Sequence, residues 1–374
     1  MEEKNICICC GCEIPEDEVY YINDEPICQD CLNEECSICE HCGDVIWNDD
    51  SVHDEHTILC TDCFNNHYYR CYECGDIIHE NEIYWHGNEP YCEQCYDNRC
   101  DDYINDYSYK PEPIFYNSSN NNYITYNNQR YYGVELEIDK GGKYDEYAEN
   151  ILYIGNKSNE HIYIKSDSSL DDGFEIVSHP MTLEYHLNEM QWQEVIYEAK
   201  ALGYRSHDTS TCGLHIHIGR NELGNTYDQQ EEIIAKIIYF IELHWNEMLK
   251  FSRRTQSNMN RWSARIGYET TSKKILHKAK ETYNRYVAVN LLNRSTVEIR
   301  MFRGTLKYNT FVATLQIVDK IVDIAINLTD EEIDNLSWSE FVSTLDKEKY
   351  SQLIQYLKER NLYINEPIVV ESEV

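Results

Sequence analysis

The chain has 374 residues, of which 42% are hydrophobic, so it is long enough for two or three domains and a sizeable core. Its 67 acidic and 32 basic side chains give a formal net charge of −35, which argues against a nucleic-acid partner and against an anionic membrane. The first 110 residues hold 28 acids and 4 bases (net −24), whereas the remaining 264 hold 39 acids and 28 bases (net −11).

The first residues, MEEKN, lack the cationic and apolar segments of a secretory signal peptide. The most apolar helical stretch, 233–243, contains Lys236 and Glu242 and is too short to cross a bilayer. We therefore expect a cytoplasmic protein. In that reducing compartment, dense cysteines are metal ligands rather than disulfides.

Cysteines dominate the N-terminal part, where 16 of the 17 lie within residues 1–100. Six Cys-x2-Cys pairs combine into three units with internal gaps of 15, 17 and 17 residues. Two pairs supply the four thiolates of a tetrahedral zinc site. The predicted ligands are Cys9, Cys12, Cys28 and Cys31 in the first unit, Cys39, Cys42, Cys60 and Cys63 in the second, and Cys71, Cys74, Cys92 and Cys95 in the third.

Each unit is too short to bury a core, so bound metal would supply much of its folding energy. We predict about three structural Zn²⁺ ions in small β-rich modules at 1–35, 36–67 and 68–102. The sequences resemble LIM-type and related treble-clef zinc domains, which implies a protein-binding role. The spacer between Cys31 and Cys39 is longer than in the LIM pattern. Other pairings stay open because four cysteines are left over, namely Cys7, Cys10, Cys36 and Cys100.

Residues 103–130 are rich in Tyr, Asn and Ser and contain two prolines, which predicts a linker. From Tyr131 to the end at 374, strand and helix patterns alternate, which indicates one α+β domain. The predicted strands are 132–138, 161–166, 173–178, 213–218 and 286–301, the last possibly two strands. The predicted helices are 183–202, 227–251, 272–283, 305–328 and 338–360.

Four of these strands alternate apolar residues with an unusual set of polar ones. Side chains at i and i+2 share one face of a strand, so each strand has one apolar and one charged face. The polar residues are Glu135, Glu137, Glu175, His215, His217, Glu298 and Arg300. A merely solvated sheet face would more often carry Lys, Thr and Ser. Carboxylates, histidines and an arginine instead favour a site for metal and phosphate.

Neighbouring strands could therefore combine their carboxylates around Mg²⁺, with nucleotide phosphate oxygens completing its shell. Arg300 and Arg303 offer forked donors for phosphate or carboxylate. Asp167 precedes Glu175 by eight residues, a spacing that a hairpin could close over one site.

At these motifs the chain resembles the amidoligases, which are carboxylate–amine ligases with a glutamine-synthetase-like fold. The motifs are GVELEI (133–138), KSDSSLDDGFEIVSHP (165–180), GLHIHI (213–218) and RYVAVNLLNRSTVEIRMFRGTL (285–306), in the expected order within about residues 130–330. The resemblance implies an antiparallel sheet whose concave face binds ATP and two or three Mg²⁺ ions. The implied reaction activates a carboxylate as an acyl phosphate, which an amine then attacks to give an amide.

Carried onto matching positions, the resemblance implies that the metal ligands are Glu135, Glu137, Glu175 and Glu298. His215 or His217 would lie at the metal or phosphate, and Arg300 would stabilise the transferring phosphoryl group. Asp167 would be a metal ligand or contact the amine substrate. Asn290 would hydrogen-bond substrate or be a buried structural amide.

Three further arginines, Arg253, Arg254 and Arg261, follow a predicted long helix. They would bind phosphate or an acidic substrate, or lie at a solvated helix end. Cys212 precedes the GLHIHI strand. The implied ligase reaction needs no cysteine nucleophile, so we interpret Cys212 as a small core residue.

Our main hypothesis is an active ATP- and Mg²⁺-dependent ligase that joins a carboxylate to an amine on a peptide or protein, with the zinc modules selecting the partner. The first alternative is a non-catalytic zinc-binding adaptor with a degenerate ligase-like domain. The second is a metal-dependent hydrolase that holds catalytic zinc. The complete set of glutamates, histidines and Arg300 favours the ligase. The acidic composition favours a cationic amine partner such as a lysine-bearing chain.

Overall fold

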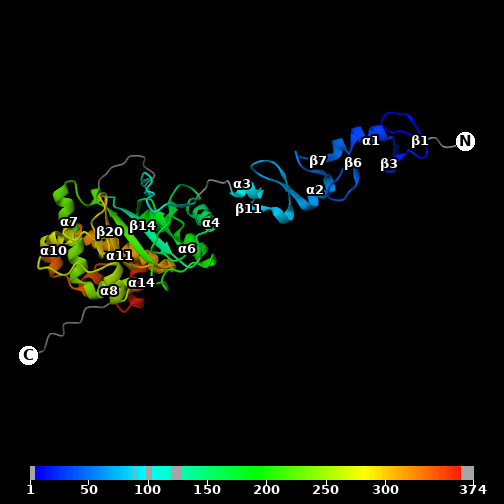
Figure 1. The fold of residues 1–374 in the computed structure, drawn as a ribbon. Helices are drawn as coiled ribbons and strands as arrows, with labels where there is room; N and C mark the ends of the chain where they lie inside the picture. Colours follow the sequence, from blue (N-terminus) through cyan, green and yellow to red (C-terminus); the bar gives the residue numbers. More distant parts are fainter. Residues whose placement is uncertain (1–4, 87–88, 98–102, 119–128, 364–374) are drawn as a thin grey trace, which may run out of the picture. The chain divides into compact units, whose positions relative to one another are not determined.

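A computed structural model describes residues 5–86, 89–97, 103–118 and 129–363 (Figure 1). The chain divides into two compact units, Met1–Asp101 and Asp102–Val374. In the described part, no helix is long and apolar enough to cross a membrane.

The first unit repeats one pattern of two small hairpins followed by a short helix. The hairpins are β1 (Asn5–Ile6) with β2 (Glu13–Ile14), β3 (Tyr20–Ile22) with β4 (Glu25–Ile27), β5 (Cys36–Ile38) with β6 (Val45–Trp47), β7 (Ser51–His53) with β8 (Ile58–Cys60), β9 (Tyr68–Arg70) with β10 (Ile77–His79), and β11 (Tyr84–His86) with β12 (Glu89–Tyr91). The helices are α1 (Gln29–Glu35), α2 (Thr61–His67) and α3 (Glu93–Asp97). The prediction of small β-rich modules is confirmed.

The second unit is built on one eight-stranded sheet, and the α+β prediction is confirmed. Its strands are β13 (Ile104–Asn105), β14 (Tyr131–Ile138), β15 (Ile162–Lys165), β16 (Phe174–Ser178), β17 (Met181–Thr182), β18 (Gly213–Gly219), β19 (Val289–Asn290) and β20 (Thr296–Arg303). They are arranged in the order β13-β15-β16-β14-β18-β20-β19, and β17 pairs with β14. All neighbours are antiparallel except β13 and β15.

Helices of this unit share one buried core with the apolar face of the sheet, some packing on the sheet and others on neighbouring helices (Figure 1). They are α4 (Asp145–Gly155), α5 (Leu183–Asn188), α6 (Trp192–Ala201), α7 (Tyr227–Leu243), α8 (Trp245–Ser252), α9 (Gln256–Trp262), α10 (Ser272–Lys280), α11 (Tyr308–Asn327), α12 (Asp330–Asp334), α13 (Trp338–Ser343) and α14 (Ser351–Glu359). Helix α11 is almost wholly buried and packs against α7 and α14. Val134, Leu136 and Ile216 lie in the same core as Phe311 and Leu315 of α11. Burying this face leaves the polar face of the same strands for the site.

The segment 103–130 differs from the predicted linker in its described part. Residues 103–118, which we call the strap, pack on the second unit. Strand β13 pairs with the edge strand β15, and at the other end Tyr116 forms a bridge with Met181. The backbone N–H of Tyr116 donates to the carbonyl of Pro180 at 2.9 Å. Such pairing with an existing sheet needs no amphipathic period in the strap itself, so the sequence pattern gives no sign of it.

Candidate active site and metal-binding clusters

Strand register brings the predicted polar side chains together on one face of the sheet. The cross-strand partners are Glu135 with His215, Glu137 with Glu175, His217 with Glu298, and Asn290 with Glu298. Directly opposed residues of antiparallel strands have Cβ atoms about 4.5–5.5 Å apart, so their side chains are in contact range. Residues from β14, β16, β18, β19 and β20 therefore meet over the middle of the sheet.

A β-bulge between β18 and β20 determines the positions of Arg300 and Arg303. Leu214 pairs with Phe302, but Ile216 pairs with Ile299, so β20 has an extra residue at this point. Such a bulge re-aims side chains locally. Arg300 reaches the polar face beside Glu298, whereas Arg303 pairs with Gly213 at the end of the strand. Arg300 lines the cavity described below, and Arg303 does not.

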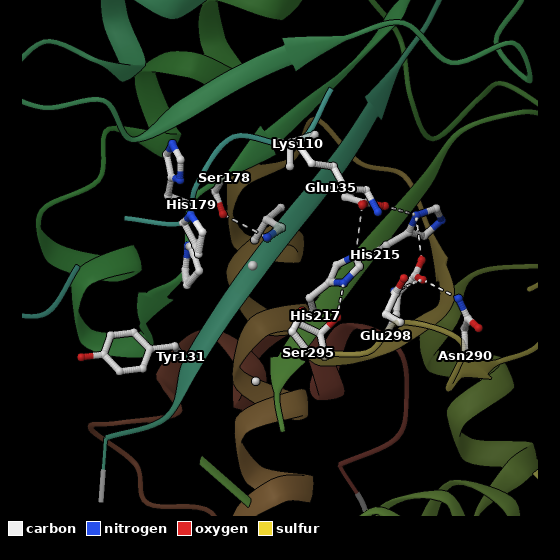
Figure 2. A pocket seen from close by; sticks show the side chains of 18 of the residues that line it. Lys110, Tyr131, Glu135, Ser178, His179, His215, His217, Asn290, Ser295 and Glu298 are labelled. Carbon is white, nitrogen blue, oxygen red and sulfur yellow. Dashed lines mark hydrogen bonds and ion pairs between the residues drawn. The ribbon is translucent and has the colours of Figure 1, made fainter. Parts of the chain in front are cut away.

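Glu135 lies at the centre of the cluster, between two histidines (Figure 2). One of its oxygens is 3.1 Å from Nδ1 of His215, and the other is 3.1 Å from Nε2 of His217. The ring of His215 also lies 3.7 Å from Glu137 and 3.7 Å from Glu298. His217 is held on its other side by Thr296, whose hydroxyl is 3.1 Å from Nδ1.

Glu298 is fixed by three donors. Asn290 donates to its Oε2 at 2.8 Å (Figure 2). Asn293 donates to the same oxygen at 3.1 Å, and Arg300 contacts Oε1. The carboxylate is therefore held in one orientation. Of these donors, Asn293 is absent from the predicted site. It lies in the loop before β20, where no strand alternation marks it.

Glu137 and Glu175 lie deeper, with 4% and 3% of their surface exposed. Glu137 accepts the backbone N–H of Gly213 and does not line the cavity. Glu175 lies 3.5 Å from the ammonium of Lys165, and its Oε2 is buried without a hydrogen-bond partner. Lys165 is a second residue absent from the predicted site, although the alternation of IYIK in β15 could have identified it.

Asp167 lies just beyond β15, buried and lining the same cavity as Glu175. Its carboxylate accepts the backbone N–H of Ser169 at 2.7 Å, which shapes the turn. Arg253 and Arg254 donate to backbone carbonyls of Arg303 and Phe302, so neither is a free helix-end charge. Cys212 is buried, and burial raises the pKa of its thiol to about 12, which suits a core residue.

The carboxylates of the cluster fall into two groups by the direction in which their pKa is shifted. Burial alone would raise the pKa of Glu135, but His217 and His215 hold it well below its usual range. Burial likewise opposes ionisation of Glu298, yet the charge of His217 lowers its pKa despite repulsion from Glu135. In contrast, burial and repulsion from Glu135 raise the pKa of Glu175 well above normal. A cation added to this cluster would favour ionisation of Glu175 and displace its proton.

Two overlapping groups have ligand atoms close enough to hold a metal ion, with all atoms within 4.8 Å of one another. They are Glu135, His217 and Glu298, and Glu135, Glu175 and His215. Carboxylate oxygens suit Mg²⁺, while imidazole nitrogens also suit transition metals. The buried Oε2 of Glu175 accepts no hydrogen bond and has only the ion pair with Lys165 at 3.5 Å, so it can serve as a metal ligand. The cavity above them has a volume of about 970 Å³, within the usual size of a small-molecule site.

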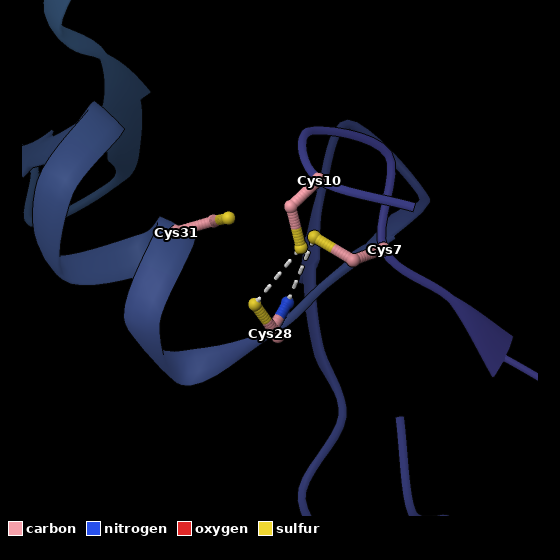
Figure 3. Close-up of side chains that lie close together, drawn as sticks. All are labelled: Cys7, Cys10, Cys28 and Cys31. Atoms are coloured by element: carbon pink, nitrogen blue, oxygen red, sulfur yellow. Dashed lines mark hydrogen bonds between the residues drawn. The ribbon is translucent and has the colours of Figure 1, made fainter. Parts of the chain in front are cut away.

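The first unit gathers its cysteines into three groups of four, each with sulfurs within 4.8 Å of one another. The groups are Cys7, Cys10, Cys28 and Cys31 (Figure 3), then Cys39, Cys42, Cys60 and Cys63, then Cys71, Cys74, Cys92 and Cys95. Tetrahedral zinc with bonds of about 2.3 Å needs sulfurs about 3.8 Å apart. The Cys10–Cys28 and Cys74–Cys92 sulfur pairs are 3.8 and 3.9 Å apart. These groups are compatible with zinc.

The first group corrects the predicted ligands, because Cys7 and Cys10 occupy the places assigned to Cys9 and Cys12. The same turn follows the leading cysteine in all three modules. Its backbone bonds are Gly11 N–H to Cys7 O, Gly43 N–H to Cys39 O, and Gly75 N–H to Cys71 O, at 2.9, 2.8 and 2.9 Å. The three glycines have φ of +72°, +82° and +80°, a backbone that other residues rarely adopt.

A signal for the correct pairing is present in the sequence. With Cys7 and Cys10 as the first pair, all three internal gaps become 17 residues and each module begins 32 residues after the last. The motif Cys-x2-Cys-Gly is then common to all three modules. Burial raises the pKa of Cys7, but backbone hydrogen bonds from Cys10, Cys28 and Cys9 outweigh it and lower the pKa to about 5. A thiolate is the form that binds metal.

We expect the double variant Cys7→Ser/Cys10→Ser to lose one zinc ion per chain, because serine oxygens cannot replace the two thiolates. The matched variant Cys9→Ser/Cys12→Ser should keep the wild-type zinc content. Metal analysis of the purified full chain by inductively coupled plasma mass spectrometry measures the difference. Loss of one ion from the second variant alone would restore the pairing through Cys9 and Cys12.

Residues 155–322, less than half of the chain, match the model of a family described as "Putative amidoligase enzyme". This region contains Asp167, Glu175, His215, Glu298 and Arg300, but it begins after β14 and so leaves out Glu135 and Glu137. The match supports an amide-forming carboxylate–amine ligase at the level of reaction class.

Among solved structures, the chain is similar to a bifunctional glutathione synthetase from Pasteurella multocida, with 14% identity and a TM-score of 0.35. The similarity covers 64% of this chain and 47% of that protein, so the chain spans about half of its length. No curated protein matches the sequence.

Proposed function

We propose that the second unit is an ATP- and Mg²⁺-dependent carboxylate–amine ligase that acts on a peptide or protein. The observation that carries this proposal is the convergence of Glu135, Glu175 and Glu298 with Arg300 in one cavity. Burial and repulsion from Glu135 raise the pKa of Glu175, so an added cation favours ionisation of all three carboxylates together. The family match of residues 155–322 supports the amide-forming class.

In this proposal Glu135, Glu175 and Glu298 hold Mg²⁺, with Glu137 supporting them from below. When bound, Mg²⁺–ATP supplies the phosphoryl group that activates the carboxylate substrate as an acyl phosphate. Arg300 faces the cavity beside Glu298 and would stabilise charge on that phosphoryl group. His215 and His217 hold Glu135 in place from two sides, which fixes the metal ligand before substrate arrives.

Asp167 lies in the cavity wall near Glu175, where it would contact the amine or a second metal ion. Arg303 does not line the cavity, so we assign it a supporting role near the buried Arg254. The cysteine clusters would each hold one structural Zn²⁺ and present a surface that selects the protein partner. In this proposal the zinc modules are residues 1–35, 36–67 and 68–102, the ligase domain is 131–374, and the protein works in a reducing intracellular compartment.

Two other functions make different predictions. A non-catalytic adaptor would retain the zinc modules and show no nucleotide turnover. A hydrolase would use zinc at the histidine-containing groups and would cleave without ATP. The second alternative has one observation in its favour, since both candidate metal groups include a histidine. The half-buried Arg300 beside the acidic groups favours phosphoryl chemistry instead.

ATP turnover by the full-length protein tests the proposal. The purified chain is incubated with Mg²⁺–ATP, a peptide pool that carries carboxylates, and a pool of amines, and ADP, phosphate and new amide bonds are measured. We expect stoichiometric ADP, phosphate and amide only when both pools are present. Failure to release ADP with any combination, while the protein is folded and zinc-loaded, would overturn the ligase. Peptide cleavage without ATP would support the hydrolase.

A further inference from the structure

The acidic and basic residues that line the active-site cavity differ in how exposed they are. The acids are Glu135, Asp167, Glu175, Glu222 and Glu298, and each is buried or half-buried. The exposed charges that line the cavity in the described part of the chain are Lys110 and Arg294, both basic. We call Lys110, Arg294 and the half-buried Arg285 together the basic mouth. An acidic floor and a basic mouth thus share one cavity.

The positive charge of the mouth is not neutralised within the chain. Among the described residues, Lys110 and Arg294 make no ion pair and no hydrogen bond through their side chains. Arg285 contacts the hydroxyl of Tyr107 and lies over the rings of Tyr107 and Tyr286, at 5.6 and 5.0 Å. Contacts with neutral rings orient a guanidinium and leave its charge in place.

The strap supplies part of this mouth. Tyr107 lies between two cations, because Lys165 is 5.2 Å from its ring on the floor side and Arg285 contacts its hydroxyl. Lys110 of the strap also lines the cavity (Figure 2). The two acids of the strap, Asp106 and Glu112, do not line the cavity. The strap therefore contributes only positive charge to the entrance.

A neutral donor lies in the same wall. His179 is 2% exposed and lines the cavity. Its Nδ1 accepts the backbone N–H of Ile114 in the strap at 3.2 Å, so the proton of the neutral ring resides on Nε2. That Nε2 is buried without a hydrogen-bond partner. A buried N–H without a partner is a site for an acceptor oxygen of a ligand.

This arrangement is unusual for a chain with net charge −35, which would repel an anion from most of its surface. Three uncompensated cations at one entrance make that entrance favourable for a ligand with several negative charges. A peptide with several acidic side chains can contact more than one of these cations at once, because its carboxylates are distributed along the chain. A single small carboxylate would use only one of these groups.

We propose that the carboxylate substrate of this cavity is an acidic peptide, a segment with several neighbouring Glu or Asp residues held by Lys110, Arg285 and Arg294. The N–H of His179 donates to a carboxylate or backbone oxygen of the same segment. The role of the acidic peptide as substrate rests on the proposed ligase function, but binding of the peptide does not require turnover. The acidic remainder of the chain is left to attract the amine partner.

Peptide binding to the full chain without ATP tests this proposal. Fluorescein-labelled hexaglutamate, hexaglutamine and hexalysine are titrated against the protein and followed by anisotropy. We expect hexaglutamate to bind at least about tenfold more tightly than hexaglutamine, and the difference to shrink when salt is raised. The double variant Lys110→Gln/Arg294→Gln should lose about tenfold in affinity for hexaglutamate. The matched variant Lys273→Gln/Lys347→Gln removes two exposed lysines elsewhere and should bind like the wild type.

Three outcomes would overturn the proposal. These are equal affinity for hexaglutamate and hexaglutamine, unchanged hexaglutamate binding by the Lys110/Arg294 variant, or an equal loss in both double variants. Calorimetric titration with Mg²⁺–ATP separates peptide from nucleotide. If the mouth variant weakens only nucleotide binding, the mouth serves phosphates and the proposal is wrong. Mouth-dependent hexaglutamate binding without ATP turnover would support the peptide site and refute only the ligase.

Discussion

Replacing Glu298 by Gln should reduce ATP-dependent amide formation by about 1,000-fold. The substitution keeps the size of the side chain and removes its charge. Asn290, Asn293 and Arg300 all donate to this carboxylate, so their donors would meet an amide that can accept at one atom only. A metal ion shared by Glu298 and Glu135 would lose one anionic ligand. Initial rates of ADP release at several Mg²⁺ concentrations measure the effect.

The control for this experiment is Glu184→Gln, an exposed glutamate in the first turn of α5. It should retain wild-type activity. Thermal unfolding of both variants verifies that the sheet is intact. A Glu298→Gln protein with more than a tenth of wild-type activity, and with an unchanged dependence on Mg²⁺, would remove Glu298 from the metal site. Loss of activity in both variants would point to a general defect instead.

The polar face of the sheet could be predicted because each strand by itself alternates apolar and polar residues. Glu135 and Glu137 in β14, and His215 and His217 in β18, are each two residues apart, which places them on one face whatever the partner strand is. Their mutual contacts depend on strand order and register, which local sequence does not encode. The pairing of His217 with Glu298 joins residues that are 81 positions apart in the chain. The predicted glutamates and histidines, with Arg300, met in space because all of them lie on β14, β16, β18 and β20, whereas Arg303 at the end of β20 lies outside the cavity.

Two features of the site could not be predicted from periodicity. The strap reaches the cavity through a two-residue parallel strand and an isolated bridge, both too short to leave a pattern. Asn293 lies in a loop whose course follows from the turn into β20.

The predicted helices 183–202, 227–251 and 338–360 are each divided in two. At His244, φ of −101° and ψ of +34° end α7 before α8 begins, although the apolar pattern continues.

The error in the first cysteine group has a different cause. Cys7, Cys9, Cys10 and Cys12 offer two Cys-x2-Cys pairs in one stretch, and spacing within the pair cannot separate them. The glycine that follows the correct pair does, because each module needs a positive φ at that point. The need for a glycine in this turn therefore identifies the ligands better than the spacing of the cysteines does.

Zinc removal should unfold the first unit and leave the second folded. The buried clusters of the first unit are small, such as Ile14, Ile22 and Ile27 with Cys7 and Cys31. Hairpins of two or three residues per strand are not stable alone. Structural zinc contributes about 10–16 kcal/mol per site. The second unit has one large continuous core and no part in these clusters.

Limited proteolysis after chelation measures this outcome. The full chain is treated with a zinc chelator, Mg²⁺ is restored, and fragments are identified by mass spectrometry. We expect rapid cleavage throughout residues 5–97 and a protected fragment that contains residues 129–363. The single variant Cys39→Ser should open the second module in the same way, whereas Cys212→Ala changes a cysteine outside the clusters and should not. Equal protection of both units without zinc would mean that the cysteine groups stabilise the modules without metal. Equal loss of both would mean that the large core of the second unit depends on the first.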